Sequence, residues 1–152
     1  EDFCTGPGQN ILQPGELLVS IRIPTIKNAS GAHYLRFIPR NEMDIAVVGA
    51  GAYVELGNRK KTFKKVRIGL AAVAPTPLFA REASESIIGR TVHEDTIEAA
   101  AEAAKGRATP ISDMRGTAEY RTHLIGVMTK RALQGAIKRA RGEFVPNAVQ
   151  ES

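Results

Sequence analysis

The spacing of apolar residues changes near the middle of the chain, and this change limits the folds available to it. In the first half, apolar residues alternate with polar ones or gather in runs of small and β-branched side chains, which is typical of strands. These segments are residues 16–23, 32–38, 45–56 and 63–72. Between the last two, Gly57, Asn58 and Arg59 predict a turn, so these strands should form an antiparallel hairpin.

In the second half, apolar residues recur every three or four positions, which is the period of an amphipathic helix. Helices are expected at residues 81–88, 94–105 and 117–141, with Gly106 and Gly142 at the ends of the last two. The longest should bury one broad stripe, consisting of Leu124, Ile125, Met128, Ala132, Leu133, Ala136, Ile137 and Ala140. Strands followed by helices predict an α+β fold, an antiparallel sheet of three to four strands packed on three helices.

The length of 152 residues and the hydrophobic content of 43% suit one domain with a real core. No apolar run approaches the roughly 18 to 20 residues needed to cross a bilayer, so no membrane association is expected. The net charge of +5 permits an acidic partner. Nucleic acid is not expected as a partner, because aromatic residues make up only 5% and no RNA-binding or zinc-finger spacing is present.

Cys4 is the single cysteine, so this chain alone cannot form an internal disulfide or a multi-thiolate metal or iron-sulfur site. A reducing compartment such as the cytoplasm is therefore expected. His33, His93 and His123 lack the spacing that places two ligands on one helix face, so surface or packing roles are expected and no metal site is predicted.

Few residues suggest chemistry. Gly49-Ala50-Gly51 lacks the third glycine and the following helix of a dinucleotide-binding fingerprint, so these small residues are interpreted as places where a helix or a cofactor ring approaches a strand.

Glu42 with Asp44, and Asp113 with Glu119, are possible carboxylate pairs, but neither has a nucleophile or metal set beside it, so no catalytic residue is assigned. Arg115 and Arg121 either pair internally with Asp113 and Glu119, which is favoured, or face an anionic partner. Thr117 or Asp113 is expected to cap the long helix.

Three stretches taken together resemble the flavoproteins of the molybdenum hydroxylases. They are Phe3 with Gly6-Pro7-Gly8 and the stretch from Ile11 to Leu18, then Tyr34 to Val48 (YLRFIPRNEMDIAVV), and Pro110 to Leu133 (PISDMRGTAEYRTHLIGVMTKRAL). Their order is similar to that of the C-terminal domain of the medium subunit in enzymes of the carbon monoxide dehydrogenase and xanthine dehydrogenase type.

This resemblance implies a domain that helps to enclose FAD, most of which an N-terminal domain would hold. It also implies partner subunits: a large one that carries molybdopterin and a small one that carries iron-sulfur clusters, from which electrons reach FAD and then an acceptor. A homo-oligomer is also compatible with the sequence. Residues 1–15 are expected to be a linker from that N-terminal domain, residues 16–142 the flavoprotein C-terminal domain, and residues 143–152 a tail.

The resemblance also assigns two cofactor-binding residues. Leu18 stands where the family places a leucine near the flavin ring, and Arg36 stands where it usually places a lysine. The change to a planar guanidinium leaves acceptor preference open. Arg40 and Asp44 match recurring positions and are expected to hold a loop near the cofactor.

Interpretations without a cofactor remain possible for the same residues. Leu18 could be an ordinary core residue, and Arg40 with Asp44 a surface ion pair. The alternative for the whole chain is a stand-alone protein-protein docking module without cofactor. An independent small enzyme is disfavoured, because no nucleophile, base and orienting group converge.

Overall fold

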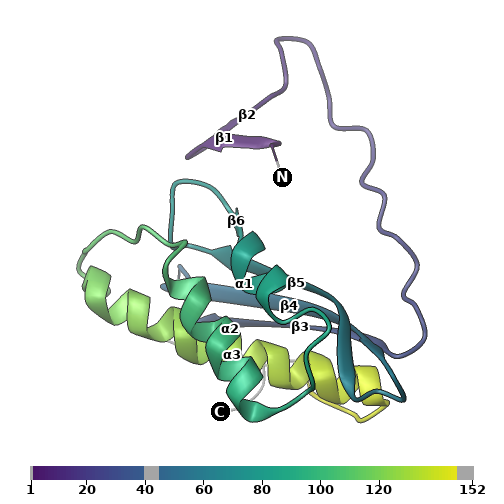
Figure 1. Cartoon of the computed structure of the whole chain (residues 1–152). Coiled ribbons are helices and arrows are strands. Elements are labelled where there is room, and N and C mark those ends of the chain that lie inside the picture. Colours follow the sequence, from purple (N-terminus) through teal and green to yellow (C-terminus); the bar gives the residue numbers. More distant parts are fainter. Residues whose placement is uncertain (1, 40–44, 147–152) are drawn as a thin grey trace.

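The computed structural model describes residues 2–39 and 45–146. Its body is one antiparallel sheet with three helices on one face (Figure 1). The strands of this sheet follow the order β3 (Ser30–Phe37), β4 (Val48–Gly57), β5 (Thr62–Ala71) and β6 (Leu78–Phe79). The helices are α1 (Arg81–Ser86), α2 (Glu94–Lys105) and α3 (Ala118–Arg141). The predicted α+β class is confirmed, and so are the predicted positions of the three helices.

Alternation decides which side chains of the sheet meet the helices. On β4, Ala50, Ala52 and Val54 are buried beneath α3, which also packs on β3. The helix contacts the sheet through its predicted apolar stripe, all of which is buried: Leu124, Ile125, Met128, Ala132, Leu133, Ala136, Ile137 and Ala140. Helix α2 packs on α3, and α1 packs on α2 and β5, so the core is a single layer between sheet and helices.

The turn and cap residues behave largely as their chemistry predicts. Asn58 begins a left-handed turn between β4 and β5, with φ of 42°. Thr117 caps α3, since its hydroxyl oxygen accepts a hydrogen bond from the Tyr120 N–H at 3.2 Å. Gly142 ends α3 with φ of 92°, which a side chain would strain, whereas Gly106 ends α2 with an ordinary helical φ of −63°.

The strand predicted at residues 16–23 is wrong for this structure. The segment between β2 and β3 runs outside the body without pairing to any described strand (Figure 1). Its apolar side chains are open to solvent, with Val19 92% and Ile23 83% exposed. A strand needs a hydrogen-bonding neighbour, and the described part of the chain supplies none at this segment.

Three short strands were not predicted. A hairpin of β1 (Cys4–Gly6) and β2 (Gln9–Asn10) lies in the expected linker, and β6 extends the sheet beyond β5. Helix α3 is the longest of the described helices. Within the described ranges, no helix combines the length and apolarity needed to cross a membrane.

Helix α3 lies unusually close to β3 because glycines face it from the strand and from the helix itself. A Cβ on Gly31 would collide with the backbone of Ala136 and Ala140. A Cβ on Gly135 would collide with the ring of His33, which is 7% exposed. These two contacts set the separation between the helix and the edge of the sheet.

We predict that Gly31→Ala lowers the free energy of unfolding by about 1 to 3 kcal/mol, since the added methyl must displace the helix backbone. Gly106→Ala is the matched control. Its Cβ would meet no atom nearer than 3.6 Å, so its stability should stay within about 1 kcal/mol of the parent. Urea unfolding followed by circular dichroism measures both, and equal stability of the two variants would contradict this packing.

His33 gives the fold a dependence on acid. Burial lowers the pKa of His33 from its ordinary value of 6.5, and the nearby Arg139 lowers it further. The unfolded chain therefore takes up the proton first, and stability should fall as the pH drops below about 6.5. His33→Gln should flatten this slope in unfolding curves measured between pH 7.5 and pH 5. An unchanged slope would assign the dependence to other groups.

Candidate functional site

Arg36 lies on the face of the sheet that the helices leave uncovered. Along β3, Gly31 faces α3 together with the side chains of His33 and Leu35, while Ala32, Tyr34 and Arg36 turn outward and are exposed. Arg36 is opposite Gly49 on β4, and Tyr34 is opposite Gly51. An exposed guanidinium and an aromatic ring therefore stand side by side above two positions without side chains.

The ring of Tyr34 explains the small residues at this point. A Cβ on Gly49 would lie 2.7 Å from Oη of Tyr34, and one on Gly51 would lie 3.4 Å from its Cδ2. Tyr34 itself stays 54% exposed, so its far side is open. The glycines are inside a strand and a strand follows them, which confirms that they do not form a dinucleotide-binding turn. The body that approaches the strand on its outer face is an aromatic side chain of the same sheet.

Leu18 and Arg36 are not brought into one site by this chain. Leu18 is in the segment that runs outside the body and is 53% exposed, so it is not an ordinary core residue of the described fold (Figure 1). Arg40 and Asp44, and with them the carboxylate pair of Glu42 and Asp44, lie outside the described residues. Among the described residues, the outer face therefore brings together Tyr34 and Arg36 without Leu18.

Arg121 holds the end of the loop that leads from β3 to β4. It is 4% exposed, and its two terminal nitrogens donate to the Val47 carbonyl at 3.0 Å and to Oδ1 of Asp113 at 2.6 Å. Arg115 also lies beside Asp113, with 3.8 Å between Nη1 and Oδ2. The internal pairing of Arg115 and Arg121 with Asp113 is confirmed. Glu119, in contrast, is stabilised by the first turn of α3.

The environment of Asp113 favours its charged form. The backbone N–H of Arg115 and the Arg121 guanidinium both donate to it, and they lower the pKa of Asp113 from its ordinary value. Its contribution to stability is therefore present above that ordinary value and is lost as the pH falls through the lowered one. At neutral pH this carboxylate is a structural anion and has no proton to give.

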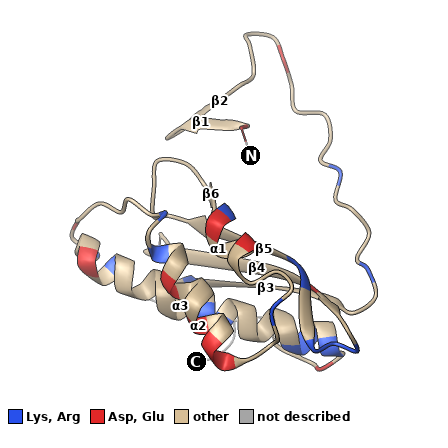
Figure 2. Cartoon of the chain, viewed as in Figure 1, with Lys and Arg blue, Asp and Glu red and all other residues tan. Residues whose placement is uncertain are grey.

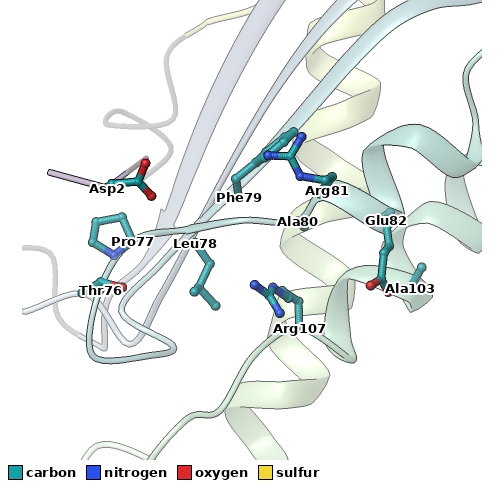
Figure 3. A pocket seen from close by; sticks show the side chains of 11 residues that line it. Asp2, Thr76, Pro77, Leu78, Phe79, Ala80, Arg81, Glu82, Ala103 and Arg107 are labelled. Carbon is teal, nitrogen blue, oxygen red and sulfur yellow. The ribbon is translucent and has the colours of Figure 1, made fainter. Parts of the chain in front are cut away.

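A second feature, which the sequence did not reveal, is a pocket of about 330 Å³ beside β6 and α1 (Figure 3). Phe79 lies in its wall, with the guanidiniums of Arg67 and Arg81 at 4.1 and 5.0 Å from its ring centroid. Arg107 also lines the pocket, and Asp2 and Glu82 supply the acidic groups. Because β6 is only two residues long, no alternating pattern could predict that Phe79 gathers these arginines.

The described residues contain no group of three or more His, Cys, Asp or Glu side chains placed to hold a metal ion. They also contain no glycine-rich turn that opens a helix, which is a common binding site for pyrophosphate. The geometry of the outer face suits a flat, partly anionic ring system, and any phosphates of the same ligand must be held by other residues.

Comparison with known proteins defines the class of this fold and site. Residues 33–136 match the CO dehydrogenase flavoprotein C-terminal domain, and the chain belongs to that family. The chain is 32% identical over 143 residues to the putative xanthine dehydrogenase FAD-binding subunit of Escherichia coli, covering 93% of this chain and 48% of that one. It is 36% identical over 140 residues to the carbon monoxide dehydrogenase medium chain of Afipia carboxidovorans, covering 92% and 48%.

Solved structures give the same result. Carbon monoxide dehydrogenase from Hydrogenophaga pseudoflava superimposes with a TM-score of 0.85 at 33% identity, covering 91% of this chain and 47% of that one. Quinoline 2-oxidoreductase from Pseudomonas putida follows with a TM-score of 0.80 at 30% identity. The chain thus spans about half the length of the relatives that it matches, and those relatives are subunits of multi-subunit oxidoreductases.

We predict that Arg121→Met lowers the free energy of unfolding by about 2 kcal/mol or more, because two hydrogen bonds of a buried guanidinium are lost. Arg131→Met, an exposed position on the same helix, should change it by less than about 0.5 kcal/mol. Thermal and urea unfolding test both variants. If the two lose equal stability, Arg121 does not hold the β3–β4 loop end.

Proposed function

We propose that this chain is the C-terminal domain of the FAD-containing medium subunit of a molybdenum hydroxylase, and that its outer sheet face closes over part of the FAD. The observation that carries the proposal is the placement of Arg36 beside the exposed Tyr34 ring, above Gly49 and Gly51. A planar ring could stack on the open side of the Tyr34 ring, which itself fills the space over Gly49 and Gly51, and the guanidinium could offer donors to carbonyl oxygens or charge at the edge of such a ring.

The protein's own residues would bind and orient the cofactor. FAD, when bound, supplies the capacity to accept and pass on electrons. Arg36 would hold the ring edge, Tyr34 would cover a face and exclude water, and Arg121 would hold the end of the neighbouring loop at Val47. No side chain of this chain is assigned a proton transfer.

The arrangement of domains forms part of the proposal. Residues 16–142 would be the flavoprotein C-terminal domain, residues 1–15 a linker from a preceding FAD-binding domain, and residues 143–152 a tail. The exposed apolar side chains of the outer segment support a preceding domain that covers them, namely Leu17, Leu18, Val19, Ile21, Ile23 and Ile26.

The wider assembly is proposed from the names of the relatives. A medium chain of carbon monoxide dehydrogenase and an FAD-binding subunit of xanthine dehydrogenase are parts of larger enzymes. Electrons would pass from molybdopterin on a large subunit, through iron-sulfur clusters on a small one, to FAD and then to an acceptor such as NAD or a quinone. The cytoplasmic location stays a prediction.

The experiment compares FAD binding by this chain and by the complete subunit from the same reading frame, using visible absorbance and flavin fluorescence. We expect FAD only in the complete subunit. Leu18→Ala and Arg36→Gln should each weaken its binding about tenfold, as loss of about 1.4 kcal/mol does, and Arg36→Gln should also shift the flavin potential.

Two control variants remove an apolar side chain and an arginine at other positions. Met114→Ala truncates a side chain that is 95% exposed, and Arg107→Gln removes a cation far from β3. A complete subunit without FAD would defeat the proposal and leave a docking module without cofactor. A complete subunit that holds FAD equally well in all variants would reject only the two assigned residues.

A further inference from the structure

Basic side chains gather at one end of the molecule, where the β4–β5 turn meets the C-terminal part of α3. Figure 2 shows this end in blue. The Lys60 ammonium donates to the Arg141 carbonyl at 3.0 Å, which joins the turn to the helix. The Phe63 N–H donates to the Arg90 carbonyl and the Val92 N–H to the Lys61 carbonyl, so the segment at Arg90 lies beside the start of β5. We call this surface the basic end, and its members, placed by the turn, the strand register, the Glu55 pairs and the last turn of α3, are Lys27, Arg59, Lys60, Lys61, Lys64, Lys65, Arg90, Lys138, Arg139 and Arg141.

Among the described residues, the carboxylates near the basic end are fewer than its cations. Glu55 is 4% exposed and is already paired with Lys64 at 2.7 Å and Lys27 at 3.6 Å. Asp95 is next to His93, at 3.3 Å from its ring nitrogen, and Glu143 is a single charge just beyond α3. The remaining cations repel one another, and an anionic partner would relieve this repulsion.

The turn that presents these cations is strained. Asn58, Arg59 and Lys60 follow one another with φ of 42°, 56° and 67°, and none of them is glycine. Such residues cost free energy and persist where surrounding contacts over-determine them, often at functional positions. Here the contact of Lys60 with the end of α3 holds the turn, while Arg59 and Lys61 point into solvent.

An exposed aromatic residue adjoins the same surface. Phe144 is 92% exposed and follows the end of α3 by a few residues. The Arg139 guanidinium donates to the Val145 carbonyl at 2.8 Å and to the Ala32 carbonyl at 2.7 Å, which fixes this segment beside β3. An aromatic anchor with a rim of charge is the usual composition of the energetic centre of a protein interface.

We propose that the basic end with Phe144 is a docking surface for the acidic face of a partner subunit in the same enzyme. This rests on the proposed function, because the relatives are named as subunits and medium chains. A protein fits better than a nucleic acid, since Phe144 is the one strongly exposed aromatic side chain among the described residues of this surface, where Tyr53 near Lys64 is only partly exposed, and single strands need a series of stacking rings. It also fits better than an anionic membrane, which favours several exposed apolar side chains beside the cations. The surface is at the opposite end of β3 from Arg36, so docking and cofactor contact are separable.

The test uses the complete subunit, assembled with the large and small subunits of its own complex. Arg59→Glu with Lys61→Glu reverses two cations but leaves the structural contacts of Lys60 and Lys64 in place. Arg107→Glu with Arg131→Glu changes the net charge equally at a distance from the basic end. Phe144→Ala tests the anchor separately.

Partner binding is measured by size-exclusion chromatography and titration at about 0.1 M NaCl and above, together with flavin content and melting temperature. The reversal at the basic end should raise the dissociation constant about tenfold or more at low salt. The difference should shrink as salt rises, and the flavin content and the melting temperature should remain those of the parent. Phe144→Ala should weaken binding at every salt concentration.

Partner binding equal to that of the control reversal would overturn the docking surface, and so would a parent subunit that holds FAD but binds neither partner. Binding to vesicles rich in phosphatidylserine, lost in the reversed variant while partner binding persists, would assign the surface to membranes and overturn it as well. A parent without FAD would instead reject the proposed function, and the two failures are therefore distinguishable.

Discussion

The distance between α3 and the sheet controls the rest of this structure. It is short because Gly31 on β3 and Gly135 on α3 leave room for backbone and for the His33 ring. The inner face of β4 also carries small side chains beneath the helix, where Ala50 and Ala52 are buried. On β3 the inner face holds His33 with the partly buried Leu35 and Phe37, whereas Tyr34 and Arg36 lie on the outer face. The core residues of β3 and the residues of the proposed cofactor contact thus lie on opposite faces of the same strand.

Much of this could be predicted because local chemistry and tertiary structure agree. The stripe on α3, the cap at Thr117 and the stop at Gly142 each follow from residue type and spacing, and the structure confirms each of them. The pairing of Arg121 with Asp113 could be anticipated from proximity in sequence. Its second partner, the Val47 carbonyl, could not, because that contact depends on where the end of a distant loop is placed.

The wrong and the missed strand predictions have a common physical origin. Whether a segment forms a strand depends on a second segment that hydrogen-bonds to it, and the sequence of the first segment alone does not show that partner. Residues 16–23 carry the alternation of a strand, yet no neighbour among the described strands bonds to them. Conversely, β6 pairs with β5 although two residues are too few to show any period. The site was limited in the same way: Arg36 was located by family resemblance, whereas Tyr34 became relevant only once the register placed it over Gly49 and Gly51.

The sheet order begins at β3, so one side of this strand has no partner strand among those described. In an antiparallel ladder the backbone groups of Ala32, Tyr34 and Arg36 point to that open side. The Arg139 guanidinium donates to the Ala32 carbonyl and so prevents another strand from pairing with the first part of this edge. Among the described residues, no strand pairs with the part of the edge near Arg36. The chain also carries an unpaired apolar segment at residues 17–23. Two copies of this chain therefore have both an acceptor edge and a candidate donor strand, the combination that leads to strand exchange and precipitation at high concentration. In the proposed complete subunit, a preceding domain that covers the apolar segment would remove the donor strand.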